Sequence, residues 1–238
     1  MINQTPLQLS LGVSLRDDAT FENFYCANTH NAYIVSYMNT LASGRDSGQC
    51  IFWGALGVGL THLLQAMCHH SANTTSNTFQ YLPVLDLLKF SADEVCDGLE
   101  GTNMVCVDGL DHICGNKAWE QAVFHLFNNL RDAGHTLIFS SHISPIALPI
   151  VLPDLKSRLL ASMHFHLKGL DDTGKQQALM QRAAARGMEL SDEVATFIMR
   201  RAPRDMNQLF VTLNRLDEAS LQQQRKLTIP FVKNVLRI

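Results

Sequence analysis

The segment Ile51-Phe-Trp-Gly-Ala-Leu-Gly-Val-Gly-Leu-Thr-His62 decides how the rest of the chain is interpreted. An apolar run leads into Gly54 and Gly59, and a helical pattern begins near Thr61. This order is typical of a phosphate-binding loop, in which backbone N–H groups surround phosphate oxygens and a Thr hydroxyl holds Mg²⁺. The motif places a Lys before that Thr, but this chain has Leu60. The segment therefore predicts a protein that holds a nucleotide better than it hydrolyses one.

Short apolar runs alternate with helical patterns on both sides of this segment. Strands are expected at Gln49–Trp53, Phe79–Leu82, Asn103–Val107, His135–Ser140 and Ser162–Leu167. Helices are expected at Thr61–Ser71 and at Lys117–Asp132, where apolar residues recur at steps of three and four. Strands that alternate with helices predict a parallel five-stranded sheet with helices on both faces.

The last part of the chain has helical patterns without strands. The expected helices are Thr173–Arg186, Asp192–Arg201, Arg204–Ala219 and Pro230–Arg237. Ser191 suits the N-cap of the second helix, and Pro230 suits the start of the fourth. The sequence therefore predicts an α/β fold with a three-layer α/β/α base at residues 21–170, an all-helical lid at 171–238 and a flexible polar tail at 1–20.

Charge is distributed unevenly along the 238 residues, which carry a net charge of −3. Residues 1–150 have five Lys and Arg against thirteen Asp and Glu, a net of −8, and residues 151–238 have fourteen against nine, a net of +5. The basic part suits a nucleotide, an acidic partner or DNA, and a solvated helical surface explains it as well. Because the N-terminus lacks the regions of a signal peptide and no segment resembles a membrane helix, a cytoplasmic protein without membrane contact is expected.

The spacing of histidines and cysteines matches no metal motif. The six cysteines show no two-residue gap of the zinc-ribbon kind. The tightest histidine groups, His69-His70 and His164-x-His166, have no evident third ligand. Structural or surface roles are therefore predicted for the ten histidines.

A carboxylate follows the third expected strand, Met104-Val-Cys-Val-Asp108, about fifty residues after the glycine-rich loop. Proteins with a phosphate-binding loop place the acid that holds the Mg²⁺ hydration shell at this point. Thr61 and Asp108 are therefore the candidate Mg²⁺ residues. Gly109 stands where proteins that hydrolyse nucleotide carry a second acid.

These motifs resemble those of the AAA+ family around the bacterial replication initiator DnaA, and in particular its homologues that promote hydrolysis of initiator-bound ATP. The resemblance extends over nearly all of residues 8–238. The similar segments are Phe21–Phe24 with Asn31 beside the adenine pocket, Gly54–Leu64 (Walker A), Val105–Asp108 (Walker B), Phe124–Leu130, Ser140–Pro145 (sensor 1), Pro153–Leu159 (arginine finger), Arg204–Leu209 (sensor 2) and Arg225–Lys233.

The resemblance implies that ADP or another nucleoside diphosphate binds between base and lid, with Mg²⁺ as its companion ion at Thr61 and Asp108. Arg204 from the lid would supply the positive charge that Leu60 does not. The expected nucleotide contacts are Phe24, Gly54, Gly57, Val58, Gly59, Leu60, Thr61, His62 and Arg204.

Three departures from the family pattern affect hydrolysis at this chain's own site. Leu60 replaces the Walker A cation, Gly109 replaces the second acid, and His142 stands where the initiator has the sensor 1 Asp. Arg158 is retained, and the resemblance implies that it acts in trans on the ATP of a partner, where such a finger contributes about 10³–10⁵ in rate. Weak or absent intrinsic ATPase activity is therefore expected, together with activation of a partner's ATPase.

Gln8-Leu9-Ser10-Leu11 resembles the short peptide by which replication proteins dock on the sliding clamp. Gln8 would form hydrogen bonds, and Leu9 and Leu11 would enter apolar pockets of the clamp. Gly12 and Val13 replace the Pro and the apolar residue that follow in the homologues. DNA would then be reached indirectly, through the clamp loaded on it.

The expected function is regulation of replication initiation through a DnaA-type initiator and the sliding clamp, the β subunit of DNA polymerase III. A self-hydrolysing ATPase of the helicase-loader type is an alternative. A DNA-binding adaptor that uses the basic lid is another, although the lid's basic residues are interleaved with acids. AAA+ domains often assemble, so self-association stays open.

Overall fold

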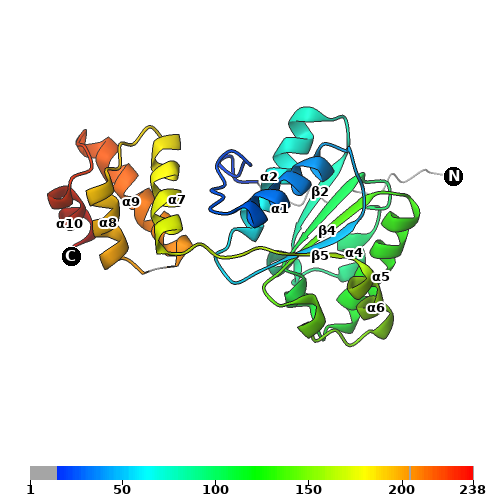
Figure 1. Ribbon diagram of the computed structural model, residues 1–238. Coiled ribbons are helices and arrows are strands. Elements are labelled where there is room, and N and C mark those ends of the chain that lie inside the picture. Colours follow the sequence, from blue (N-terminus) through cyan, green and yellow to red (C-terminus); the bar gives the residue numbers. More distant parts are fainter. Residues whose placement is uncertain (1–14, 204, 238) are drawn as a thin grey trace.

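The computed structural model of the protein describes residues 15–203 and 205–237. Figure 1 shows an α/β base and a separate helical lid, connected by an extended segment between β5 (Met163–His166) and α7 (Asp172–Ala185). This architecture confirms the predicted AAA+ fold, with a parallel five-stranded sheet in the base and an all-helical C-terminal lid.

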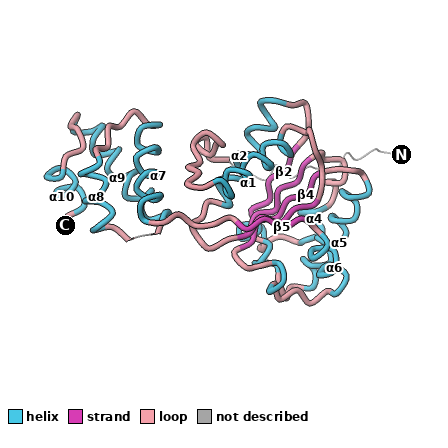
Figure 2. Tube along the Cα trace, in the orientation of Figure 1, coloured by secondary structure: helices cyan, strands magenta, loops and turns pink. Residues whose placement is uncertain are grey.

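The base is built around five parallel strands in the order β2-β3-β4-β1-β5 (Figure 2). Apart from β5, the strands are β1 (Gln49–Trp53), β2 (Phe79–Pro83), β3 (Met104–Asp108) and β4 (Thr136–Ser141). Their bounds agree with the predicted ranges to within one residue. Because all strands run in the same direction, the loops that follow β1, β3 and β4 meet at one edge of the sheet, which is where such folds bind ligands.

Each central strand contributes apolar side chains to both faces of the sheet. Ile51 packs in the core on the α5 side, whereas its neighbours Cys50 and Phe52 pack in the core on the α2 side. This follows from the alternation of side chains along a strand, which makes a strand buried on both faces read as a continuous apolar run.

Four longer helices cover the two faces of the sheet, and shorter ones lie in the connections. The longer helices are α1 (Thr29–Ala42), α2 (Leu60–Thr74), α5 (Lys117–Asp132) and α6 (Pro153–Ala161). The shorter ones are α3 (Val84–Leu87), α4 (Ala92–Cys96), η1 (Leu110–Ile113) and η2 (Pro145–Ala147). Helix α5 has its predicted bounds, while α1 and α6 were not predicted as helices.

The lid has its own apolar core, formed by four helices. They are α7, α8 (Asp192–Arg201), α9 (Met206–Gln223) and α10 (Ile229–Leu236). The side chain of the residue before each helix accepts a hydrogen bond from the helix's first turn. Such caps contribute about 1 kcal/mol each. Within residues 15–203 and 205–237, no helix combines the length and apolar character needed to cross a membrane.

Residues 15–20, the end of the expected tail, pack against the rest of the protein. Ala19 is fully buried, and the backbone N–H of Arg16 donates to Gln65 Oε1 at 3.2 Å. These residues therefore contact the base, although they belong to the segment predicted as a flexible tail. The expected clamp-binding residues Gln8, Leu9 and Leu11 and the expected sensor 2 residue Arg204 lie outside the described residues. The following ones can be placed: Phe24, Gly54, Gly57, Val58, Gly59, Leu60, Thr61, His62, Asp108 and Arg158.

Candidate functional site

The loop between β1 and α2 requires glycine for steric reasons. A Cβ on Gly54 would lie 2.5 Å from the carbonyl oxygen of Leu167, and one on Gly59 would lie 2.6 Å from Phe24 Cε2. Gly57 and Gly59 have φ of 82° and 99°, the left-handed region that side chains disfavour. No side chain of the described residues caps α2 at Gly59. The first N–H groups of α2 are therefore oriented to bind an anion.

A cleft of about 260 Å³ lies between this loop and the lid. Residues of the base, of the connection and of the lid line this cleft. Those of the base are Asn23, Phe24, Tyr25, Asn31, Ala55, Leu56, Gly57, Val58, Gly59 and His62. Those of the connection are Lys168, Gly169 and Leu170, and those of the lid are Lys175, Ala178, Arg182, Asp205, Met206 and Phe210. The structure thus brings five of the expected nucleotide contacts to one cleft: Phe24, Gly57, Val58, Gly59 and His62.

Other expected contacts are placed differently. Leu60 is only 3% exposed and packs in the core on the α2 side, so its side chain faces away from the cleft. Gly54 lies below the loop against Leu167, and Thr61 is exposed in the first turn of α2.

Positive charge in the cleft comes from residues that the motifs did not indicate. Lys168 lies in the connection between base and lid, and Lys175 and Arg182 lie on α7. One negative charge also borders the cleft, because the carboxylate of Asp205 lies next to Gly57 of the loop. The sequence signal for the three cations was only the excess of basic residues after residue 150.

His62 connects the loop helix to the N-terminal segment and does not point its ring at the phosphate site. Its Nε2 lies 2.8 Å from the carbonyl oxygen of Thr20, and its ring lies 5.8 Å from that of Phe24. Burial lowers the pKa of His62 below its usual value. The imidazole is therefore neutral at pH 7, and because a carbonyl only accepts, Nε2 carries the proton. The ring of His62 thus lies beside that of Phe24, which borders the cleft.

The Walker B carboxylate of Asp108 is held by two hydroxyl groups. Tyr81 Oη donates to its Oδ2 at 2.6 Å, and Ser140 Oγ donates to its Oδ1 and accepts the N–H of Gly109 at 2.8 Å. Burial and the neighbouring charge of Asp108 raise the pKa of Tyr81, so the phenol stays protonated. Asp108 is thus oriented at the carboxyl end of β3 with lone pairs left over for a hydrated ion.

Arg158 lies at the opposite edge of the sheet from the glycine-rich loop. It is exposed on α6 and lines a hollow with Gly48 and Met163, which lie where β1 and β5 begin. A five-residue strand spans about 17 Å, so Arg158 is too far to reach the chain's own cleft. Within the described residues Arg158 forms no ion pair. The buried carboxylate of Glu120 fixes the start of this helix by accepting the N–H groups that precede Pro153.

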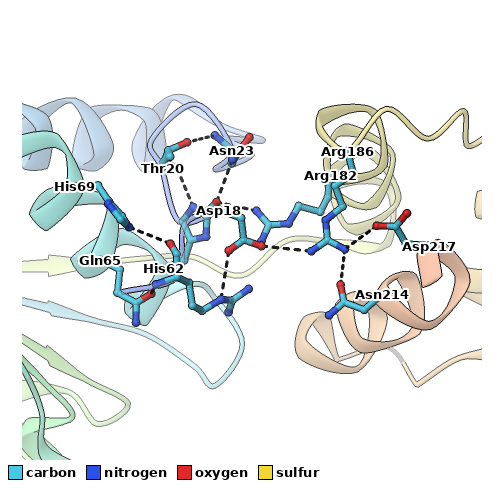
Figure 3. Close-up of polar contacts among 11 residues, drawn as sticks. Asp18, Thr20, Asn23, His62, Gln65, His69, Arg182, Arg186, Asn214 and Asp217 are labelled. Atoms are coloured by element: carbon cyan, nitrogen blue, oxygen red, sulfur yellow. Dashed lines mark hydrogen bonds and ion pairs between the residues drawn. The ribbon is translucent and has the colours of Figure 1, made fainter. Parts of the chain in front are cut away.

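Asp18 joins the base to the lid (Figure 3). Its Oδ2 pairs with the guanidinium groups of Arg182 and Arg186, and its carbonyl accepts from Arg182 at 3.0 Å. Arg186 continues the network to Asn214 and Asp217 on α9. We refer to Asp18, Arg182 and Arg186 as the base–lid latch.

The arginine side chains around Asp18 determine its protonation state. Burial alone would raise the pKa of Asp18, but the guanidinium groups of Arg182, Arg16 and Arg186 outweigh it and lower the pKa below its usual value. The carboxylate is therefore ionised at neutral pH, and the latch is charged on both sides.

Two family models match the chain. The model of the bacterial DnaA ATPase domain matches residues 15–166, and the model of the Hda lid domain matches residues 172–236. Domain III of the replication initiation protein DnaA from Thermotoga maritima is similar in structure, with a TM-score of 0.80 and 20% identity over 94% of this chain and 98% of that one.

Two further solved structures share the fold. AMPPCP-bound DnaA from Aquifex aeolicus has a TM-score of 0.71 and 19% identity over 86% of this chain and 67% of that one. The RuvB Holliday junction branch migration motor of Thermotoga maritima has a TM-score of 0.66 and 13% identity over 92% and 73% of the two chains.

Proposed function

Because the chain belongs to the family of the bacterial DnaA ATPase domain, we propose that it is an Hda-like regulator of replication initiation. In this proposal it holds ADP or another nucleoside diphosphate between base and lid and docks on the DNA-loaded sliding clamp. From there it promotes hydrolysis of ATP bound to a DnaA-type initiator. The match of residues 172–236 to the Hda lid domain supports this choice within the family.

Binding of a nucleotide is supported by the cleft. Backbone N–H groups at the start of α2 are oriented for the phosphates, Phe24 borders the space expected for the base, and Lys175 and Arg182 add positive charge from the lid. Arg204 would join them. Thr61 and Asp108 offer the oxygen donors that Mg²⁺ prefers, and the fixed carboxylate of Asp108 suits a water-mediated contact.

Loss of turnover is supported by the residues at three positions. Leu60 places no cation beside the phosphates, and Gly109 and His142 provide neither the second acid nor the sensor 1 Asp. Without these groups the site stabilises the bound nucleotide but not the charge that develops during phosphoryl transfer.

The position of Arg158 carries the proposal. Its guanidinium is exposed and lies at the sheet edge away from the chain's own cleft, so the nucleotide it can serve is one bound by a neighbouring protein. An arginine finger supplied in trans stabilises transition-state charge in this way.

The test is an Arg158→Ala variant. We expect its stimulation of initiator-bound ATP hydrolysis, measured as phosphate release with clamp loaded on DNA, to fall by about 10³-fold or more. Lys156→Ala on the same helix is the matched control and should stimulate normally. Normal stimulation by Arg158→Ala would remove the finger assignment. Rapid ATP hydrolysis by the purified wild-type chain without initiator would favour the alternative, a self-hydrolysing ATPase of the helicase-loader type.

A further inference from the structure

Three side chains with metal-binding groups meet at the carboxyl edge of the sheet. Asp111 and His112 lie in η1, just after β3, and His142 directly follows β4. One donor atom of each lies within 4.8 Å of the other two. Tetrahedral Zn²⁺, with bonds of about 2.0–2.1 Å, separates its ligand atoms by about 3.3 Å. Asp111 Oδ2 and His142 Nδ1, which are 3.4 Å apart, already have this spacing.

The absence of a side chain at Gly109 leaves space for the imidazole of His112. A Cβ on Gly109, whose φ is 94°, would lie 2.7 Å from His112 Cδ2. The N–H of His112 donates to the carbonyl of Gly109 at 3.0 Å, which closes the turn. Thus the glycine that replaces a catalytic acid also makes room for a second imidazole beside His142.

The carboxylate of Asp111 is oriented before any ion binds. Its Oδ1 accepts the backbone N–H of His142 at 3.2 Å, so its Oδ2 faces the imidazole. The side chains of Asp111 and His142 are 11% and 33% exposed, while His112 is exposed. The imidazole rings of His112 and His142 are 6.5 Å apart at 61°, so they face each other from different directions. The ring of His112 belongs to an exposed residue.

We propose that Asp111, His112 and His142 bind a divalent transition metal ion, with Zn²⁺ as the preferred ion. Two imidazole nitrogens and one carboxylate oxygen are a ligand set that zinc adopts with water in the fourth position. Mg²⁺ and Ca²⁺ prefer oxygen ligands, so this site is distinct from the one proposed at Thr61 and Asp108. The bound ion would fasten η1 to the loop after β4, with His112 turning on its exposed side to close the coordination.

The experiment is a Zn²⁺ titration of the metal-stripped full-length protein against a chromophoric chelator. We expect one equivalent at micromolar or tighter affinity, weakened at least about tenfold in His112→Ala and in His142→Ala. His125→Ala, which removes an exposed histidine on α5, is the matched control and should bind like the wild type. Because His112 is exposed, its variant should melt like the metal-free wild type.

Two further readouts identify the ligands. Zn²⁺ should raise the melting temperature of the wild type by mass action, and this increase should be lost in His112→Ala. Co²⁺ in the site should show ligand-field bands without a thiolate charge-transfer band. Wild-type Zn²⁺ affinity in both histidine variants, a thiolate band, or no Zn²⁺ binding by the wild type would each overturn the proposal. None of these measurements involves nucleotide, clamp or initiator, so they are independent of the proposed function.

Discussion

Leu60 occupies the position at which phosphate-binding loops carry their cation, and its environment explains why no cation is present. The side chain is 3% exposed among apolar residues beneath α2, where a charged group would lose its hydration. Positive charge reaches the cleft from Lys168, Lys175 and Arg182 instead. Part of the cleft's attraction to phosphate therefore comes from the lid, in addition to the N–H groups of α2, and that part is lost when the lid moves away.

Gly59→Ala tests the close packing of the loop against the cleft wall. The new methyl group would lie 2.6 Å from Phe24 Cε2, and φ of 99° is unfavourable for Ala. We expect the free energy of unfolding to fall by about 1–2 kcal/mol. We also expect weaker ADP binding, because Phe24 must leave its position. Urea unfolding and isothermal titration with ADP measure the two effects.

Gly115→Ala is the control that separates the effect of backbone strain from the effect of contact with Phe24. Gly115 has φ of 82°, but nothing lies within 4 Å of the position of its added methyl group. Its variant should lose similar stability and keep the ADP affinity of the wild type. Unchanged ADP affinity in Gly59→Ala would contradict the assignment of Phe24 to the nucleotide site.

Helix α7 is joined to the base through the base–lid latch. The side chain of Arg182 is only 4% exposed, so its positive charge is buried where it pairs with the carboxylate of Asp18. A buried charge without its partner retains the cost of its lost hydration, so the latch stabilises the contact mainly by avoiding an unpaired guanidinium.

Asp18→Asn should lower the free energy of unfolding by about 1–3 kcal/mol at pH 7. The folded pKa of Asp18 is lowered, so its contribution is complete above the unfolded pKa of about 4 and is lost as pH falls through the folded value. Urea unfolding at pH 7 and near pH 3 should therefore show variant and wild type converging in acid.

Asp17→Asn serves as the matched control, because Asp17 is exposed next to Asp18. It should resemble the wild type at both pH values. If Asp18→Asn keeps its full deficit near pH 3, the stabilisation does not come from the charge of this carboxylate.

The elements that the sequence predicted well are those whose own residues carry the signal. The central strands are buried on both faces and appear as apolar runs, and α5 shows regular apolar spacing that ends near Asp132. Helix α1 was missed because its pattern is weak. It contains Asn31, which is buried because its amide bonds with Lys168 rather than because it is apolar.

The candidate site was predictable only in part, because the molecule assembles it from distant segments. The motifs identified Gly57, Gly59 and Asp108, whose roles depend on local geometry. Lys175 and Arg182 follow the loop by more than a hundred residues and belong to no motif, so only the folded structure brings them to the cleft. The cluster of Asp111, His112 and His142 was missed for the same reason, since its members come from η1 and from the loop after β4.

Docking on the clamp is a prediction about the whole molecule. A Gln8→Ala/Leu11→Ala variant should bind the DNA-loaded clamp at least about tenfold more weakly in surface plasmon resonance, because its hydrogen-bonding and apolar anchors are removed. Its stimulation of initiator-bound ATP hydrolysis should fall in proportion, while its melting temperature stays unchanged.

Asn3→Ala/Gln4→Ala, a change of equal size in the same tail, is the matched control and should bind the clamp normally. Clamp binding at wild-type strength by the Gln8→Ala/Leu11→Ala variant would show that another part of the chain makes the contact. ADP affinity should be the same in both variants, because the proposal assigns none of the four residues to the nucleotide site.

The N-terminal segment contacts the lid at more than one residue. Asp18 pairs with Arg182 of α7, and the carbonyl oxygen of Glu22 accepts a hydrogen bond from Gln181 Nε2 of the same helix at 3.0 Å. Together with the peptide connection after β5, these contacts restrict rotation of the lid relative to the base. Release of the Asp18 contact would remove part of this restraint, and the two walls of the cleft would then lose their alignment as well as their closure.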